Sequence, residues 1–172
     1  VRTIFSENPN GRFESFPQTL DWRLPAPWEG KVRLLRFNIK TGEKYSFEPF
    51  SQQKGGIIAP PLNISKHKLC IVWDSINGGI AGISYNDNKF DKNWEINIRP
   101  TMQPIYFEQS NELIINHFDD KSDYLVVIDV LEGKILSKVN LKTPMANGMF
   151  LTPGFNNDVL YCSTLAISKV SW

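Results

Sequence analysis

Short apolar segments alternate with clusters of Gly, Asn, Asp and Pro along most of the chain. The segments are rich in Val, Ile, Tyr and Phe, which favour β-strands, and no stretch keeps an apolar period of 3.6 residues beyond a turn or two. The clusters supply residues that accept a positive φ or bond to their own backbone, as tight turns require. The pattern therefore predicts an all-β protein with little helix.

Two kinds of predicted strand differ in the spacing of their apolar residues. Residues 124–128 (Tyr-Leu-Val-Val-Ile) are apolar throughout, which is typical of a strand buried on both faces of its sheet. Residues 94–99 (Trp-Glu-Ile-Asn-Ile-Arg) alternate between apolar and polar, which indicates one dry and one wet face. Stacked sheets with enclosed inner strands and half-exposed outer strands give this mixture.

The predicted strands recur in a fixed order. Residues 37–44 match residues 128–135 as a strand, a turn with Gly and a second strand, about 91 residues (128 − 37) further along. This offset is two periods of about 45 residues, the size of a propeller blade. The intervening strands recur in three copies, within residues 57–85, 103–130 and 147–170. The sequence thus predicts β-propeller blades, each a four-stranded antiparallel sheet.

The repeat divides the chain unevenly. We expect residues 1–30, with their prolines and aromatic residues, to form an irregular segment or the remnant of a preceding blade. The propeller repeats then occupy residues 31–172. They comprise half a blade at 31–50, blades at 56–99 and 102–140, and most of a blade at 147–172. Closed propellers have about 4 to 8 blades, so we expect a partial propeller or one completed by a second copy.

Two propeller groups are similar to parts of this sequence. Residues 111–117 (Asn-Glu-Leu-Ile-Ile-Asn-His) and 124–136 resemble the repeat of quinoprotein-like propellers, the group of the PQQ-dependent dehydrogenases. Residues 147–154 (Asn-Gly-Met-Phe-Leu-Thr-Pro-Gly) resemble a segment of the gluconolactonase and strictosidine-synthase-like calcium hydrolases. The second resemblance implies that Asn147 is a calcium ligand, although the aspartate that follows Leu-Tyr in that group is missing here, where Cys162 and Ser163 stand. Both resemblances imply a periplasmic or secreted protein.

Polar residues at predicted strand ends are the candidates for ligand binding, because propeller loops converge at the mouth of the channel. His117 and Asp119 set an imidazole beside a carboxylate, a pair that suits a general base or a metal ligand. The alternative is a solvated strand end, with Asp74 capping a turn and Arg99 as a surface charge. The candidates are Asp74, Arg99, Gln103, Asn116, His117 and Asp119.

Composition narrows the function classes. A formal net charge of +1 offers no overall field for nucleic acid or an anionic membrane, and no apolar run reaches the roughly 20 residues of a membrane span. The two cysteines, Cys70 and Cys162, lie in apolar runs and are expected to be buried thiols. The compartment stays open.

Motifs of catalysis do not occur in the sequence. We find no phosphate-binding glycine loop, G-x-S-x-G elbow, HExxH helix or paired CxxC, and no assembled quinone site, so no cofactor is evident. The sequence therefore favours a non-enzymatic propeller module that recognises a protein or small ligand at the channel mouth. The alternative is a calcium-dependent lactonase-like hydrolase, with Ca²⁺ bound by Asn147 and carboxylates of other blades.

Overall fold

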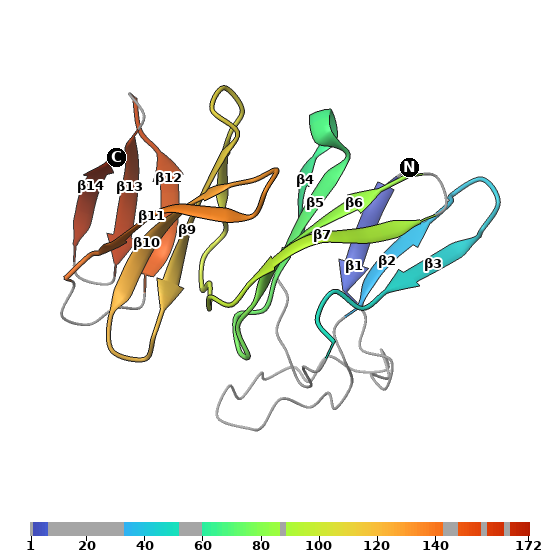
Figure 1. Ribbon diagram of the computed structural model, residues 1–172, viewed down its shortest axis with the longest axis horizontal. Coiled ribbons are helices and arrows are strands. Elements are labelled where there is room, and N and C mark those ends of the chain that lie inside the picture. The colour runs from blue at the N-terminus through green and yellow to red at the C-terminus, as the bar shows by residue number, and fades with distance from the viewer. Residues whose placement is uncertain are drawn as a thin grey trace, which may run out of the picture.

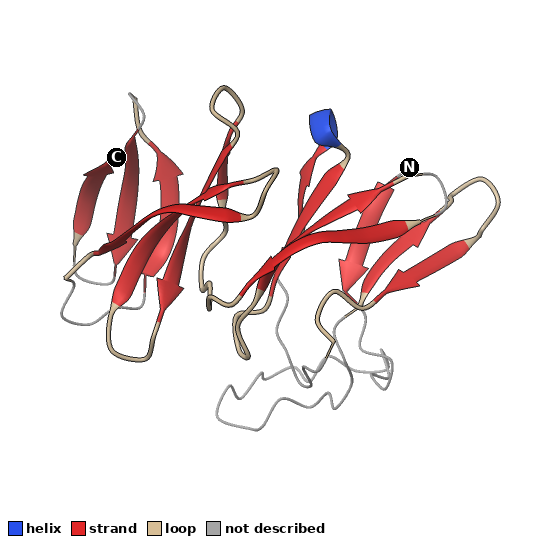
Figure 2. Ribbon diagram, in the orientation of Figure 1, coloured by secondary structure: helices blue, strands red, loops and turns tan. Residues whose placement is uncertain are grey.

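A computed structural model describes residues 2–6, 33–51, 60–86, 89–142, 148–155, 158–163 and 166–172. These residues form β-strands almost throughout, together with one 3₁₀ turn, η1 (Ser65–His67), which confirms the prediction of an all-β chain with little helix (Figure 2). Among the described residues, no helix is long and apolar enough to cross a membrane. The strands are β1 (Arg2–Ser6), β2 (Leu34–Phe37), β3 (Lys44–Phe47), β4 (Leu62–Ile64), β5 (Leu69–Trp73), β6 (Ile80–Tyr85), β7 (Phe90–Ile96), β8 (Ile105–Phe107), β9 (Glu112–Phe118), β10 (Asp123–Asp129), β11 (Lys134–Asn140), β12 (Gly148–Pro153), β13 (Asp158–Ser163) and β14 (Ile167–Ser171).

Consecutive strands pair in four antiparallel sheets, β1–β3, β4–β7, β8–β11 and β12–β14. The sheets lie side by side in chain order (Figure 1). Sheets β4–β7 and β8–β11 fall inside residues 56–99 and 102–140, where two blades are expected. The first strands of the last two sheets, β8 and β12, lie next to each other.

The first sheet takes a strand from the N-terminal segment. Strand β1 pairs antiparallel with β2, with Arg2 opposite Phe37 and Thr3 opposite Arg36. The described part of residues 1–30 is therefore a paired strand, whereas residues 7–30 lie outside the described part of the chain. Three strands, rather than two, make up the sheet that contains residues 34–47.

Three apolar clusters fill the spaces between neighbouring sheets. Strand β5 contributes to two of them, because its alternate side chains point to opposite faces of the sheet. Leu69 and Ile71 pack with residues of β9 and β10, whereas Cys70 and Val72 pack toward Leu34 of β2. Strand β10 is divided in the same way between the cluster shared with sheet β4–β7 and the one shared with sheet β12–β14. The two middle sheets are thus buried on both faces.

Trp94 of β7 fixes the position of sheet β4–β7 against sheet β8–β11. Its indole Nε1–H donates a hydrogen bond to the backbone carbonyl of Val130 at 2.8 Å. A Cβ added at Gly82, or at Gly133 in the β10–β11 turn, would come within 2.3 Å of the indole ring. Both positions therefore need glycine for the ring to fit between the two sheets.

The segments that match in sequence, 37–44 and 128–135, fold into the same turn. The side-chain Oδ1 atoms of Asn38 and Asp129 accept hydrogen bonds from the amides two and three residues further on. Gly42 and Gly133 each donate their amide to the main-chain oxygen four residues earlier at 2.8 Å, with φ of 75° and 67°. The two matching segments therefore share the same pattern of hydrogen bonds in their turns.

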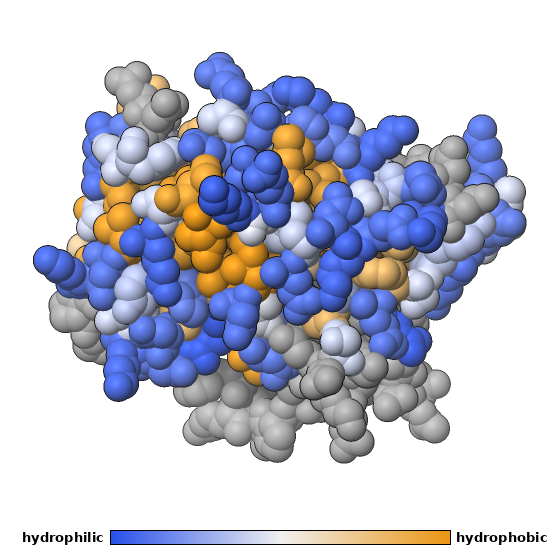
Figure 3. Space-filling model, in the orientation of Figure 1, coloured by the Kyte–Doolittle hydropathy of each residue, from blue (hydrophilic) through white to orange (hydrophobic). Residues whose placement is uncertain are grey.

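Strand β11, the outer strand of its sheet, is richer in exposed apolar side chains than the outer strand β7. An apolar area covers this part of the molecular surface (Figure 3). The exposed apolar residues of β11 and the preceding turn are Leu131, Ile135, Leu136 and Val139. The corresponding exposed residues of β7 are polar: Lys92, Asn93 and Glu95. The outer edges of the sheets therefore differ in polarity.

Candidate functional site

All six described candidates lie at one end of the sheets. In an antiparallel meander every second connection falls at the same end, so the connections β5–β6, β7–β8 and β9–β10 share an end (Figure 1). Asp74, Arg99, Gln103 and Asp119 belong to these connections, and Asn116 and His117 lie at the adjoining end of β9. The structure thus gathers residues that are up to 45 positions apart in sequence (119 − 74).

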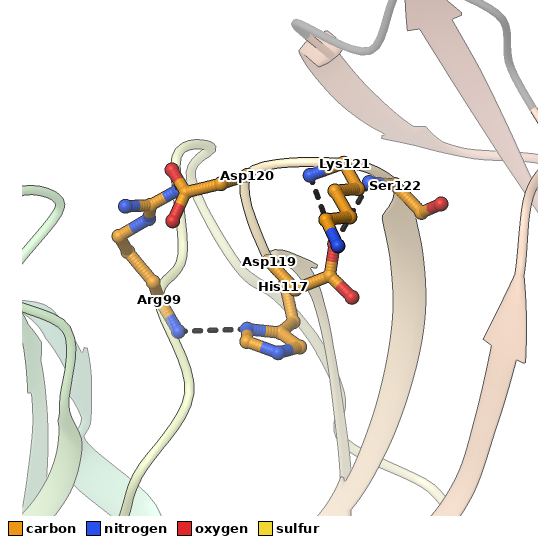
Figure 4. Close-up of polar contacts among 6 residues, drawn as sticks. All are labelled: Arg99, His117, Asp119, Asp120, Lys121 and Ser122. Atoms are coloured by element: carbon orange, nitrogen blue, oxygen red, sulfur yellow. Dashed lines mark hydrogen bonds and ion pairs between the residues drawn. The ribbon is translucent and has the colours of Figure 1, made fainter.

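Arg99 and His117 form the centre of the candidate site (Figure 4). The backbone N–H of Arg99 donates to Nδ1 of His117 at 2.9 Å, and the carbonyl of Arg99 accepts the amide of Phe118 at 3.0 Å. The guanidinium of Arg99 lies 5.1 Å from the centre of the Phe118 ring and forms an ion pair with Asp120. Its backbone is therefore bound to β9, while the side chain reaches the surface.

The hydrogen bond from Arg99 sets the tautomer of the His117 ring. Because Nδ1 is the acceptor, the neutral ring has its proton on Nε2. Partial burial holds the pKa of His117 below its ordinary value, and the positive charge of Lys138 lowers this pKa further. The half-buried imidazole also stacks on Tyr124, with ring centres 5.8 Å apart. His117 is thus a neutral hydrogen-bond donor near pH 7.

Asp119 caps the tight turn between β9 and β10. Its Oδ1 atom accepts the backbone amides of Ser122 at 2.8 Å and Lys121 at 3.1 Å (Figure 4). These hydrogen bonds, the one from Ser122 foremost, lower the pKa of the exposed Asp119 carboxyl. The next residue, Asp120, has a φ of 73° and points its carboxylate at Arg99. The Asp119 carboxylate is therefore used by the turn itself, whereas the Asp120 carboxylate faces Arg99.

Asn116 is buried and bonds to the β7–β8 connection. Its Oδ1 atom accepts the amides of Thr101 and Met102, both at 3.0 Å. Its amide nitrogen donates to the hydroxyl of Thr101 at 2.7 Å and to the carboxylate of Asp123 at 2.9 Å. The hydroxyl of Tyr161 donates to the same carboxylate at 2.6 Å. This network anchors the loop that carries Arg99 and leaves Asn116 no exposed surface for a ligand.

Asp74 and Gln103 differ from Arg99 and His117 in their surroundings. Asp74 is fully buried, and its carboxylate accepts the amides of Ile76 and Asn77 and the side-chain amide of Asn77. It caps its own turn, which is the alternative considered from the sequence. Gln103 has an exposed side chain between two buried neighbours, Met102 and Pro104.

Four residues of this end were not among the candidates. Asp123 and Tyr161 complete the buried network, and Tyr124 and Lys138 flank His117, with the Lys138 ammonium 4.4 Å from the centre of the Tyr124 ring. One signal for Asp123 was available in the sequence, since it shares the strand parity of the apolar Leu125. The partner of Asp123, Tyr161, is 38 residues away and has no such signal.

The calcium hypothesis concerns a residue outside the described part of the chain, Asn147. Within the described residues, no group of three or more His, Cys, Asp or Glu side chains is placed to bind a metal ion. Both cysteines are free thiols; Cys70 is buried as expected, whereas Cys162 is half-buried. Binding of Ca²⁺ through Asn147 stays a prediction.

Chemically, the described site offers hydrogen-bond donors and charges rather than a nucleophile. The Arg99 guanidinium, the Nε2–H of His117 and the Lys138 ammonium lie around two aromatic rings, with Asp119 and Asp120 beside them. Such a mixed surface can bind a polar ligand. Neither a protein-family model, nor a curated protein, nor a solved structure matches this chain.

Proposed function

We propose that the four sheets are blades of a β-propeller. Each sheet is an antiparallel meander in chain order, and successive sheets pack face to face through apolar clusters. In a propeller the first strands of the blades surround the central axis, and the proximity of β8 and β12 supports this arrangement. The matching turns at Gly42 and Gly133 support a common origin of two of the blades.

We infer that the propeller module binds a polar small molecule, or a polar segment of a protein, at the end where Arg99 and His117 lie. One observation carries this proposal: the Arg99 side chain is about a quarter exposed, and its backbone and that of Phe118 are bound together. A charged group whose main chain is rigid and whose head is at the surface can recognise a ligand with little loss of conformational entropy.

A ligand screen that reads the melting temperature tests this proposal. Compounds and peptides that stabilise the wild-type protein are measured again with Arg99→Ala and with His117→Gln. The control is Lys66→Ala, because η1 lies at the opposite end of the sheets and Lys66 is 54% exposed beside Glu108. We expect the stabilisation to shrink in both site variants and to persist in the control.

A contrary result is equally clear. If stabilisation by every hit persists in Arg99→Ala and His117→Gln but is lost in Lys66→Ala, the ligand binds the other end of the sheets. Chemical-shift changes of the backbone amides, mapped on the strands, would show the same reversal. The Arg99 and His117 end would then have no role in binding.

A further inference from the structure

Sheet β12–β14 has one covered and one open face. Val159 of β13 and Val170 of β14 pack in the cluster shared with sheet β8–β11. Side chains one position along these strands point the other way. On that second face, Phe150 of β12 is 63% exposed and Ile167 of β14 is 73% exposed. This open face thus presents apolar side chains to solvent, whereas the two middle sheets are buried on both faces.

The strand register orders the open face into rows across the sheet. Phe150 is opposite Cys162, and Cys162 is opposite Ile167. Leu160 lies in the next row, opposite Lys169. Side chains that are directly opposite in antiparallel strands stand on the same face. The first row is therefore apolar across all three strands, with the thiol of Cys162 at its centre.

The charges of the open face are neutralised within the sheet. The ammonium of Lys169 lies 2.8 Å from a carboxylate oxygen of Asp158, which is buried beneath it. A surface that covers this face therefore needs no compensating charge. Two copies of the same face can meet without repulsion between like charges, which would otherwise disfavour a symmetric contact.

We propose that two copies of this chain form a dimer by stacking these open faces about a two-fold axis parallel to the strands. Such an axis places β12 of one copy over β14 of the other. Phe150 then lies against Ile167 of the second copy, and Cys162 lies near its own counterpart at the middle of the row. A face that is self-complementary in this way is what a two-fold interface requires.

The dimer interface uses the same kind of contact as the interfaces inside the chain, although it places β12 over β14, whereas the chain itself sets the first strands β8 and β12 next to each other. Each internal interface stacks one apolar sheet face on another. The open face, three strands about 4.8 Å apart and about 17 Å long, is smaller than the roughly 800 Å² per partner of a stable complex. Association is therefore weak, and it is sought at high protein concentration.

Sedimentation equilibrium, from micromolar to millimolar protein, tests the dimer. We expect the wild-type mass to rise toward twice that of the chain. Ile167→Lys should weaken dimerisation at least about tenfold, because burial of an isoleucine accounts for that factor or more. The matched control is Ile39→Lys, since Ile39 is 77% exposed in the β2–β3 turn, away from the open face. It should dimerise as the wild type does.

Cross-linking locates the contact. Stacked sheets lie about 10 Å apart, too far for the roughly 4.4–6.8 Å between the Cα atoms of a disulfide, so a short bis-maleimide is used. A covalent dimer that disappears in Cys162→Ala supports the proposal. A chain that stays monomeric at every concentration overturns it. So does a dimer that Ile167→Lys and Ile39→Lys weaken equally, or a wild-type monomer whose binding of a hydrophobic dye is lost only in Ile167→Lys, which assigns the face to another protein.

Discussion

The fit of Trp94 between two sheets leads to a prediction about a matched pair of glycines. Gly42 and Gly133 occupy the same turn with similar positive φ angles, yet their surroundings differ. A Cβ at Gly42 would meet no atom within 4 Å, whereas a Cβ at Gly133 would be 2.3 Å from Cγ of Trp94. Replacement by alanine therefore separates the effect of the backbone from that of the clash.

The two effects have different sizes. An alanine in the left-handed region costs about 1–2 kcal/mol, and part of this is offset because alanine also restricts the unfolded chain, by about 0.4–1 kcal/mol. We expect Gly42→Ala to lower the free energy of unfolding by about 1 kcal/mol. Forcing a methyl group into a filled core adds about 1–3 kcal/mol, so Gly133→Ala should lose about 2–4 kcal/mol.

Urea denaturation followed by circular dichroism measures the difference. For a chain of this length, each kcal/mol also lowers the melting temperature by about 2–4 °C. A further variant, Trp94→Leu, removes the ring, and in that background Gly133→Ala should cost no more than Gly42→Ala does. Equal losses for the two glycines in the wild-type background would refute the idea that Trp94 locks the two sheets together.

Three other outcomes follow from the described contacts. Tyr161→Phe removes one hydrogen-bond donor from the buried Asp123 carboxylate, so the free energy of unfolding, measured by urea denaturation, should fall by about 1–3 kcal/mol. No change would show that water or another group replaces the hydroxyl. The pKa of His117 is lowered on folding, so its contribution to stability is complete above pH 6.5, the value taken for the unfolded chain, and is lost as the pH falls toward the folded pKa. Thermal melts between pH 7.5 and 5.5 should show this loss, and His117→Gln should reduce it, while Lys138→Ala should raise the His117 pKa in an NMR titration. Burial raises the pKa of Cys70 to about 12, so iodoacetamide should modify Cys70 only when the protein unfolds. Mass spectrometry of the native protein measures this modification. Alkylation of Cys70 at the rate of a free thiol would contradict the prediction.

The strands and their two-sided burial could be predicted from the sequence because the signal is local. Residues 124–128 are apolar without a break, and the structure divides them between clusters on the two faces of β10. The alternation of residues 94–99 indicated an outer strand. Trp94 to Ile96 do end the outer strand β7, whereas residues 97–99 belong to the β7–β8 connection. The pairing of Arg2–Ser6 with β2 could not be predicted, since its partner is about 30 residues away.

The candidate site was predictable only in part. Strand ends were easy to find, and they led to Arg99 and His117, which the structure brings into contact. The sequence could not tell that the oxygens of Asp74 and Asn116 are occupied by backbone amides, because this depends on how each turn folds. It also could not show that Tyr161 reaches Asp123, because that bond joins two different sheets.

The apolar clusters have a thermodynamic consequence that the arrangement of the sheets makes simple. Each described cluster joins neighbouring sheets in chain order. In such a linear array the stability is close to a sum of one energy for each unit and one coupling energy for each adjacent pair. Weakening the coupling in the middle, between β4–β7 and β8–β11, then divides the chain into two halves that melt separately, whereas damage at either end releases a single sheet.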